Sequence, residues 1–206
     1  MAVHPTSVNN SFLRHLVFWG LFLPLLSILL VPLFAPDQKI HGEEITMVSE
    51  MGVDVTSLNS HSRQTFTRFF VDTKLVSSTE KFFSGRVEGK PDSPRTAFSR
   101  KWINGVWQMV YRAVWRLRAL SLIFFIPVIC LALPAFIDGL SVRARKKYDF
   151  EADNPGIFYS SAHLATVALG LFVCLPFLPF ALTANLLALM LVALAGAVWV
   201  ASSNFQ

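Results

Sequence analysis

Three stretches of this chain contain no charged residue, and each is long enough to cross a lipid bilayer. The first spans residues 16–34, the second spans residues 119–137, and no charged residue follows Asp153. About 20 consecutive apolar residues make a helix that spans the hydrocarbon core of a membrane. The last stretch has room for two such helices, separated by Pro176 and Pro179. The sequence therefore predicts an all-α polytopic membrane protein with about four transmembrane helices.

The composition agrees with this fold class. Only 15% of the residues are charged, whereas soluble domains carry about 25%, and the mean hydropathy is +0.51. The formal net charge of +5 would suggest a nucleic-acid partner in a soluble protein. In a membrane protein, however, basic residues flank the spans and face anionic lipid. The chain has no recognisable nucleic-acid-binding motif, so we expect no direct contact with nucleic acid.

The predicted spans divide the chain into four parts. Residues 1–35 contain a polar head and the first transmembrane helix, whose apolar run is longer than the roughly 7–15 residues of a signal-peptide core. Residues 36–97 are hydrophilic, and their apolar residues recur at helical spacing. We expect this region to be a small helical extracytoplasmic region in the periplasm, either as a cap packed on the membrane part or as a phenylalanine-rich docking surface. Residues 98–118 form an amphipathic interfacial helix, and residues 119–206 form a three-helix membrane region.

The amphipathic stretch has three tryptophans on its apolar side, Trp102, Trp107 and Trp115, and basic residues that include Arg112 and Arg116 largely on the opposite side. Indole rings and long basic side chains are both favoured at the membrane interface. The pattern therefore predicts that these five residues contact lipid or a partner. The amphipathic helix is expected to run directly into the second span.

The second span is expected to cover about residues 117–137 and to end at Asp138-Gly139. Pro127 and Pro134 should bend it, because each removes a backbone hydrogen-bond donor. Asp138 allows two interpretations. It could form a buried ion pair with Arg143 that fixes the following loop or contacts a partner, or it could be an interfacial carboxylate beside a glycine turn.

The predicted loop 140–155 contains a dense basic cluster, formed by Arg143, Arg145, Lys146 and Lys147. Basic residues in short loops tend to remain in the cytoplasm. We therefore expect this loop and both termini to be cytoplasmic, residues 36–97 to lie outside, and the cluster to contact a partner or lipid. In the fourth span, Ala184, Ala188 and Gly196 form a row of small residues that suits close helix packing or subunit contact.

The sequence contains no pattern of a catalytic, cofactor or metal site. There is no phosphate-binding loop, dinucleotide fingerprint, HExxH or GxSxG motif, and the histidines lack ligand spacing. Cys130 and Cys174 both lie inside apolar runs, so no thiolate metal site is available. No span has a charged residue at its middle, which argues against an ion-coupled transporter. We expect a protein that is not an enzyme and has no catalytic residue, cofactor or metal.

The second half of the chain resembles a family of integral inner-membrane proteins encoded in integrating conjugative elements and related conjugative plasmids. The resemblance covers about residues 112–206 and is carried by Arg116-Leu117-Arg118, Ile137-Asp138-Gly139-Leu140, Arg143 with the basic cluster, Phe158-Tyr159, Ala162-His163 and the proline-containing turn between the last two spans. The chain departs from the family pattern in lacking a basic residue soon after Ala162-His163 and a basic tail.

The resemblance implies an accessory of conjugative DNA transfer in the bacterial inner membrane, beside a type IV secretion channel and its coupling ATPase. It implies no catalytic residue. Two other functions stay open from the residues alone. An oligomeric channel or facilitator would need polar residues along one face of several spans, and an enzyme acting on lipid would need clustered histidines and carboxylates at the interface.

Overall fold

Helices make up most of the part of the chain that the structure describes, which comprises residues 14, 17–35, 37–84, 94–148 and 155–204 of this computed structural model. The described residues contain no strand, and the all-α fold class is confirmed. In chain order the elements are η1 (Phe18–Phe22), α2 (Leu23–Phe34), α3 (Gly42–Glu50), α4 (Val55–Phe66), η2 (Thr67–Val71), α5 (Leu75–Ser84), α6 (Pro94–Tyr148), α7 (Pro155–Cys174), η3 (Leu175–Phe177) and α8 (Ala184–Ser203).

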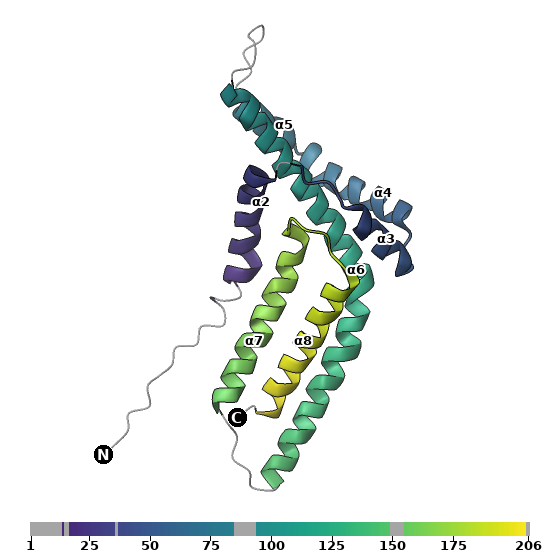
Figure 1. Cartoon of the computed structure of the whole chain (residues 1–206), viewed down its shortest axis with the longest axis vertical. Helices are drawn as coiled ribbons and strands as arrows, with labels where there is room; N and C mark the ends of the chain where they lie inside the picture. Colours follow the sequence, from purple (N-terminus) through teal and green to yellow (C-terminus); the bar gives the residue numbers. More distant parts are fainter. Residues whose placement is uncertain (1–13, 15–16, 36, 85–93, 149–154, 205–206) are drawn as a thin grey trace, which may run out of the picture.

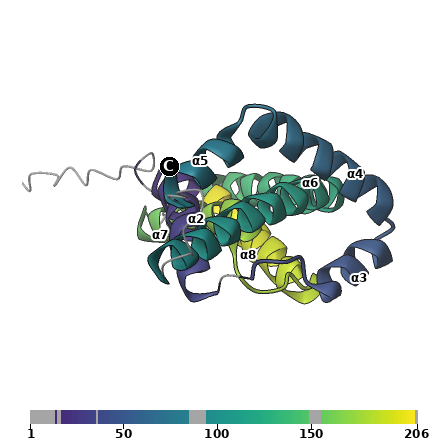
Figure 2. The ribbon, with the colours of Figure 1, turned by 90° about the horizontal axis from the view of Figure 1, so that it is seen from above.

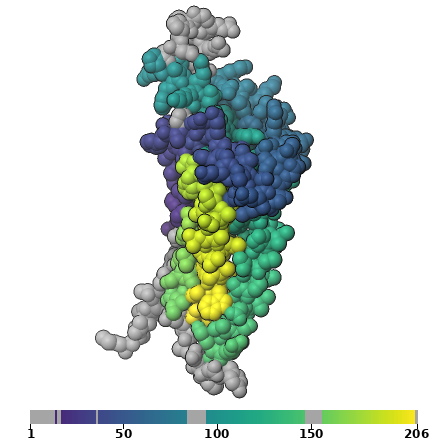
Figure 3. Space-filling view, turned by 45° about the vertical axis from the view of Figure 1, so that its right-hand side comes forward, coloured from purple at the N-terminus to yellow at the C-terminus, as the bar shows by residue number. Residues whose placement is uncertain are grey.

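Three helices are long and apolar enough to cross a membrane, namely α6, α7 with η3, and α8. The first apolar run forms a shorter apolar helix over Phe18–Phe34. Figure 3 shows α8 lying between α7 and the second half of α6. Thr183 caps the start of α8, because its Oγ1 accepts a hydrogen bond from the backbone N–H of Leu186 at 3.3 Å.

The longest element, α6, joins the amphipathic stretch and the second apolar run in one unbroken helix. At 1.5 Å per residue it is about 80 Å long, more than twice the hydrocarbon thickness of a bilayer. Pro127 and Pro134 lie within it, and neighbouring helices make such prolines tolerable in membrane helices. The predicted end of the helix at Asp138-Gly139 is wrong. Residues 140–148 of the predicted loop are helical, and the rest of that loop up to residue 154 lies outside the described residues.

The helices give the molecule two distinct ends (Figure 1). At one end α6 finishes, α7 begins and α8 finishes, with Lys146 Nζ 3.1 Å from Asn204 Oδ1. At the other end α3, η2, α4 and α5, which we call the cap, lie around the first half of α6 (Figure 2). The cap and the last turns of α6 are therefore far apart along the long axis of the protein.

Local signals explain the helices of the cap. Gly52 follows the end of α3 with a φ of +82°, a backbone conformation that glycine adopts readily and that commonly ends helices. Asp54 then caps α4, because its carboxylate accepts hydrogen bonds from the N–H groups of Thr56 and Ser57 at 2.9 and 3.3 Å. The two short helices can therefore turn back on each other over α6.

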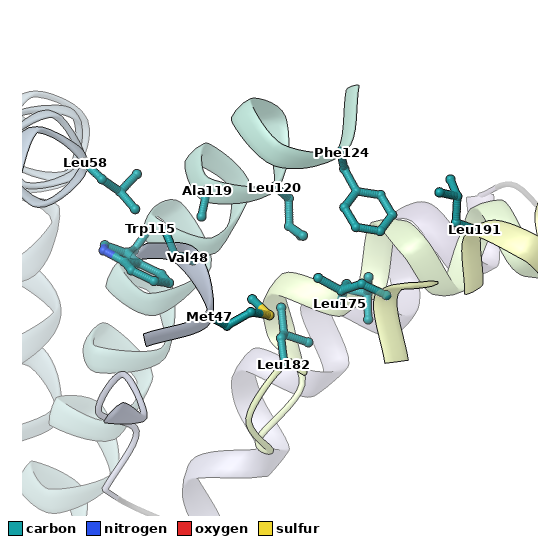
Figure 4. Close-up of a cluster of buried hydrophobic side chains, with 11 residues drawn as sticks. Met47, Val48, Leu58, Trp115, Ala119, Leu120, Phe124, Leu175, Leu182 and Leu191 are labelled. Atoms are coloured by element: carbon teal, nitrogen blue, oxygen red, sulfur yellow. The ribbon is translucent and has the colours of Figure 1, made fainter. Parts of the chain in front are cut away.

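The hydrophobic core lies where the cap meets α6 and the turn between α7 and α8 (Figure 4). Its members come from all of these elements: Met47, Val48, Leu58, Trp115, Ala119, Leu120, Phe124, Leu175, Leu182, Leu187 and Leu191. Such burial is the main driving force for packing in water. The described helices of this region thus pack as a cap against α6 and the α7–α8 turn. Phe69 and Phe82 stay 58% and 80% exposed, so the docking alternative stays a prediction.

The first apolar helix is displaced toward the cap relative to α7 and α8. The start of this helix lies beside α7, where Cys174 Sγ is 3.1 Å from the carbonyl oxygen of Trp19. Gly170 of α7 has no side chain, which leaves room for the side chain of Trp19. Further along, the carbonyl oxygen of Leu29 accepts a hydrogen bond from Trp102. Consequently α2 lies largely alongside the amphipathic part of α6 (Figure 1).

Candidate functional site

A buried ion pair connects the cap to the membrane helices. Glu44, in the first turn of α3, faces Arg116 of α6, and both side chains are at most 1% exposed. Arg116 Nε donates to Glu44 Oε2 at 3.0 Å, and its Nη2 donates to Oε1. A guanidinium and a carboxylate joined by two parallel hydrogen bonds form the strongest type of protein ion pair.

The same two side chains also form hydrogen bonds with backbone groups of the turn between α7 and α8. Arg116 donates to the carbonyl oxygens of Leu175 at 3.3 Å, of Leu178, and of Phe180 at 2.7 Å. Glu44 Oε1 accepts a hydrogen bond from the backbone N–H of Leu182 at 3.1 Å. Buried charges are tolerated only when they are paired and hydrogen-bonded. The pair therefore holds three distant segments, α3, α6 and the α7–α8 turn, in one arrangement.

Arg112 lies one turn before Arg116 and belongs to the same cluster. Its side chain is 1% exposed, and its Nη2 donates to the carbonyl oxygen of Leu178 at 2.8 Å. We call Glu44, Arg112 and Arg116 the arginine clasp. Because two arginines approach the carbonyls of one turn, the end of the α7–α8 hairpin is fixed against α6.

The prediction that Arg112, Arg116 and Trp115 contact lipid or a partner is wrong, because all three are buried within the chain. The physical reason is that the cap covers this part of α6. Sequence reasoning missed Glu44 entirely. The only available signal was that Arg112 and Arg116 are four residues apart and so share one helix face, where two cations need an acidic partner if that face is covered.

Each of the three tryptophans on the apolar side of the amphipathic stretch donates its indole N–H to a different helix. Trp102 donates to the Leu29 carbonyl of α2 at 3.0 Å, Trp107 to Thr79 Oγ1 of α5 at 3.0 Å, and Trp115 to Asn59 Oδ1 of α4 at 2.7 Å. Tryptophan combines a large apolar surface with one polar donor. The apolar side of this part of α6 thus packs against other helices of the same chain. Trp102 and Trp107 stay partly exposed.

The basic cluster lies at the opposite end of the molecule, on the last turns of α6. Arg145 is exposed, whereas Arg143 and Lys146 are partly buried. Lys146 Nζ lies 3.1 Å from Asn204 Oδ1, and the side chain of Lys147 lies outside the described residues. Cations at the C-terminal turns of a helix are favoured by the helix dipole. We call these four residues the basic end.

Asp138 lies within the continuous helix α6, so the glycine that follows it does not form a turn. The Asp138 side chain contacts a neighbouring helix, α8. Its Oδ2 accepts a hydrogen bond from Trp199 Nε1 of α8 at 2.7 Å. Directly after it, a Cβ atom on Gly139 would overlap Ser202 Oγ and would lie 2.7 Å from the carbonyl oxygen of Trp199. Asp138 and Gly139 therefore mark a close contact between α6 and α8.

Over the described residues, no three histidine, cysteine, aspartate or glutamate side chains gather in a way that could hold a metal ion. The charged groups that the structure brings together instead make the arginine clasp, whose polar atoms bind parts of the same chain.

A family model matches residues 37–206, which include the cap and all three long apolar helices. Its description is that of DtrJ-like proteins, IncC plasmid conjugative DNA transfer proteins. Neither a curated protein nor a solved structure matches the chain. The match confirms the resemblance to proteins of conjugative elements and implies a role in conjugative DNA transfer.

Proposed function

The chain belongs to the DtrJ-like family of conjugative DNA transfer proteins, and we propose that it is a non-enzymatic accessory or scaffold subunit of the transfer apparatus in the bacterial inner membrane. Its partners would be other membrane subunits of a type IV secretion system and the coupling ATPase. The observation that carries this proposal is the placement of a basic end and a packed cap at opposite ends of one continuous membrane helix.

The rigid connection between the two ends supports a scaffold. The arginine clasp ties the cap to α6 and to the α7–α8 turn, and Asp138 and Gly139 hold α8 against α6 near the other end. A helix that is fixed by packing at several levels keeps its ends at a set separation. Such a protein can position one partner on each side of a membrane without performing chemistry.

The distribution of basic residues supports an orientation. The basic end has four cations within five positions, and basic residues close to a span favour the cytoplasmic side. The C-terminal end of α8 lies beside Lys146 and would face the cytoplasm with it, whereas the cap would face the periplasm. A cytoplasmic cation cluster is complementary to an acidic surface on a partner such as the coupling ATPase.

Replacing Arg143, Arg145, Lys146 and Lys147 together with glutamine should weaken the binding of a cytoplasmic partner. Removing the charges of an interface slows association and removes attraction, so we expect recovery of that partner to fall about tenfold or more. The protein should stay in the membrane, because the apolar spans are unchanged. The measurement is quantitative co-purification from solubilised membranes of cells that carry the conjugative element.

The matched control replaces two exposed lysines of the cap, Lys74 and Lys81, with glutamine, and it should leave recovery of the same partner unchanged. A single Arg145→Gln variant separates the loss of charge from the loss of the Lys146 contact with Asn204. Equal recovery of every partner with the fourfold variant and the natural protein would contradict the proposed contact.

A further inference from the structure

A groove with both apolar and polar walls runs between the cap and the first half of α6. One part, of about 910 Å³, is lined by Ile40, Ile45, Asn59, Ser60, Arg63, Gln64, Thr67, Arg68, Asp72 and Tyr111. A second part, of about 480 Å³, is lined by Gln38, Lys39, Ile40, Phe66, Asn104, Trp107, Gln108 and Tyr111. The two parts meet at Ile40 and Tyr111, so they form one groove, which we call the cap groove.

The charges that line the cap groove are mostly positive. Lys39, Arg63 and Arg68 oppose a single carboxylate, Asp72. Lys39 already pairs with Asp37 at 3.2 Å, whereas neither arginine forms a salt bridge with a carboxylate of the residues that the structure describes. Arg63 and Arg68 are both exposed, and arginine forks match carboxylates with two hydrogen bonds. The groove thus offers the guanidinium groups of Arg63 and Arg68 to an acidic ligand.

The remaining walls of the cap groove offer amide groups and ring edges. Asn59, Gln64, Asn104 and Gln108 supply side-chain amides whose N–H groups can donate hydrogen bonds. The oxygens of Asn59 and Gln108 already accept hydrogen bonds from Trp115 Nε1 and from the backbone N–H of Gln38. Gln38 is 2% exposed, and its Oε1 has no hydrogen-bond partner within the described chain. This oxygen has no exposed surface, so a ligand in the groove would be recognised by the exposed amides and arginines instead.

The aromatic residues of the groove are already packed against one another. Phe66 meets Trp107 and Tyr111 edge to face, with ring centroids 6.2 and 5.5 Å apart and interplanar angles of 79° and 88°. Binding of single-stranded nucleic acid relies on open aromatic faces for base stacking. The rings therefore suit apolar side chains better than bases, and the amides suit a peptide backbone.

We propose that the cap groove binds an acidic peptide segment of a partner protein on the cap side of the membrane. Carboxylates of that segment pair with Arg63 and Arg68, and its backbone hydrogen-bonds to the amide side chains. This surface lies at the opposite end from the basic end, so the inference goes beyond the proposed contact with a cytoplasmic partner and can fail or hold independently of it.

The test places the photoreactive residue p-benzoylphenylalanine at Tyr111 of the full-length protein in cells that carry the conjugative element. After irradiation, the cross-linked peptides are identified by mass spectrometry. We expect an adduct with an aspartate- or glutamate-containing segment of another protein of the transfer apparatus. A second probe at Gln64, an exposed groove residue, should give an adduct with the same segment even if the Tyr111 replacement disturbs the groove.

Charge reversal in Arg63→Glu/Arg68→Glu should lower the yield of this adduct about tenfold, whereas Lys74→Glu/Lys81→Glu, which reverses two exposed cap charges outside the groove, should not. A probe at Phe82, which is 80% exposed and outside the groove, should not give the adduct. The proposal is overturned by an adduct with nucleic acid or lipid, by a segment without acidic residues, by no adduct at both groove positions, or by a yield that charge reversal does not change.

Discussion

Replacement of Arg116 by methionine should destabilise the folded protein by about 3–5 kcal/mol, the usual cost of leaving one member of a buried ion pair without its partner. Glu44 would stay buried with the Leu182 N–H and the half-exposed His41 as its remaining polar neighbours. The carbonyls of Leu175 and Phe180 would also lose their arginine donor. The midpoint of thermal unfolding in detergent should fall by on the order of 10 °C.

Two further variants test whether the ion pair itself is responsible. Arg118→Met removes an exposed arginine two residues away and should change stability by no more than about 0.5 kcal/mol. The double variant Glu44→Met/Arg116→Met removes both charges and should recover much of the loss, because a buried pair replaced by apolar groups is often nearly neutral. A thermal midpoint of Arg116→Met equal to that of the natural protein would contradict the structural role of the clasp.

Gly139→Leu should force α6 and α8 apart near the basic end. The new Cβ would overlap Ser202 Oγ, which can rotate, but it would also press on the carbonyl oxygen of Trp199, which belongs to the backbone of α8. Overpacking of this kind costs about 1–3 kcal/mol. The hydrogen bond between Trp199 and Asp138 should lengthen or break, and the loss of stability is measured by thermal unfolding in detergent together with tryptophan fluorescence.

Gly196 offers a matched control within α8, because a Cβ added there meets nothing within 4 Å. Gly196→Leu should therefore be neutral or slightly stabilising, since glycine is a poor helix former. If Gly139→Leu were as stable as Gly196→Leu, the close approach of α6 and α8 at Gly139 would not hold.

The arrangement around Arg112 and Arg116 shows where sequence reasoning reaches its limit. The apolar runs and the spacing of Trp102, Trp107 and Trp115 were enough to predict helices, because helical periodicity is a local property. The same amphipathic face is expected whether lipid or another part of the protein covers it. Glu44 lies 72 residues before Arg116, and no local pattern links the two. The burial of the clasp therefore became evident only from the three-dimensional structure.

The end of the second span was mispredicted for a related reason. Asp138-Gly139 has the composition of a turn, yet α6 continues through it to Tyr148. Glycine serves there to let α8 approach, and Asp138 serves to bind Trp199. A glycine that permits close packing and a glycine that ends a helix look identical in a single sequence. The basic end consequently lies on a helix and not, as expected, in a loop.

An in-frame deletion of the gene, scored by the transfer frequency of its conjugative element, tests the central claim most directly. If the protein is a subunit of the transfer apparatus, transfer should fall to the background of the assay and should return when an intact copy is supplied in trans. An unchanged transfer frequency in the deletion strain would contradict a required role in conjugative DNA transfer.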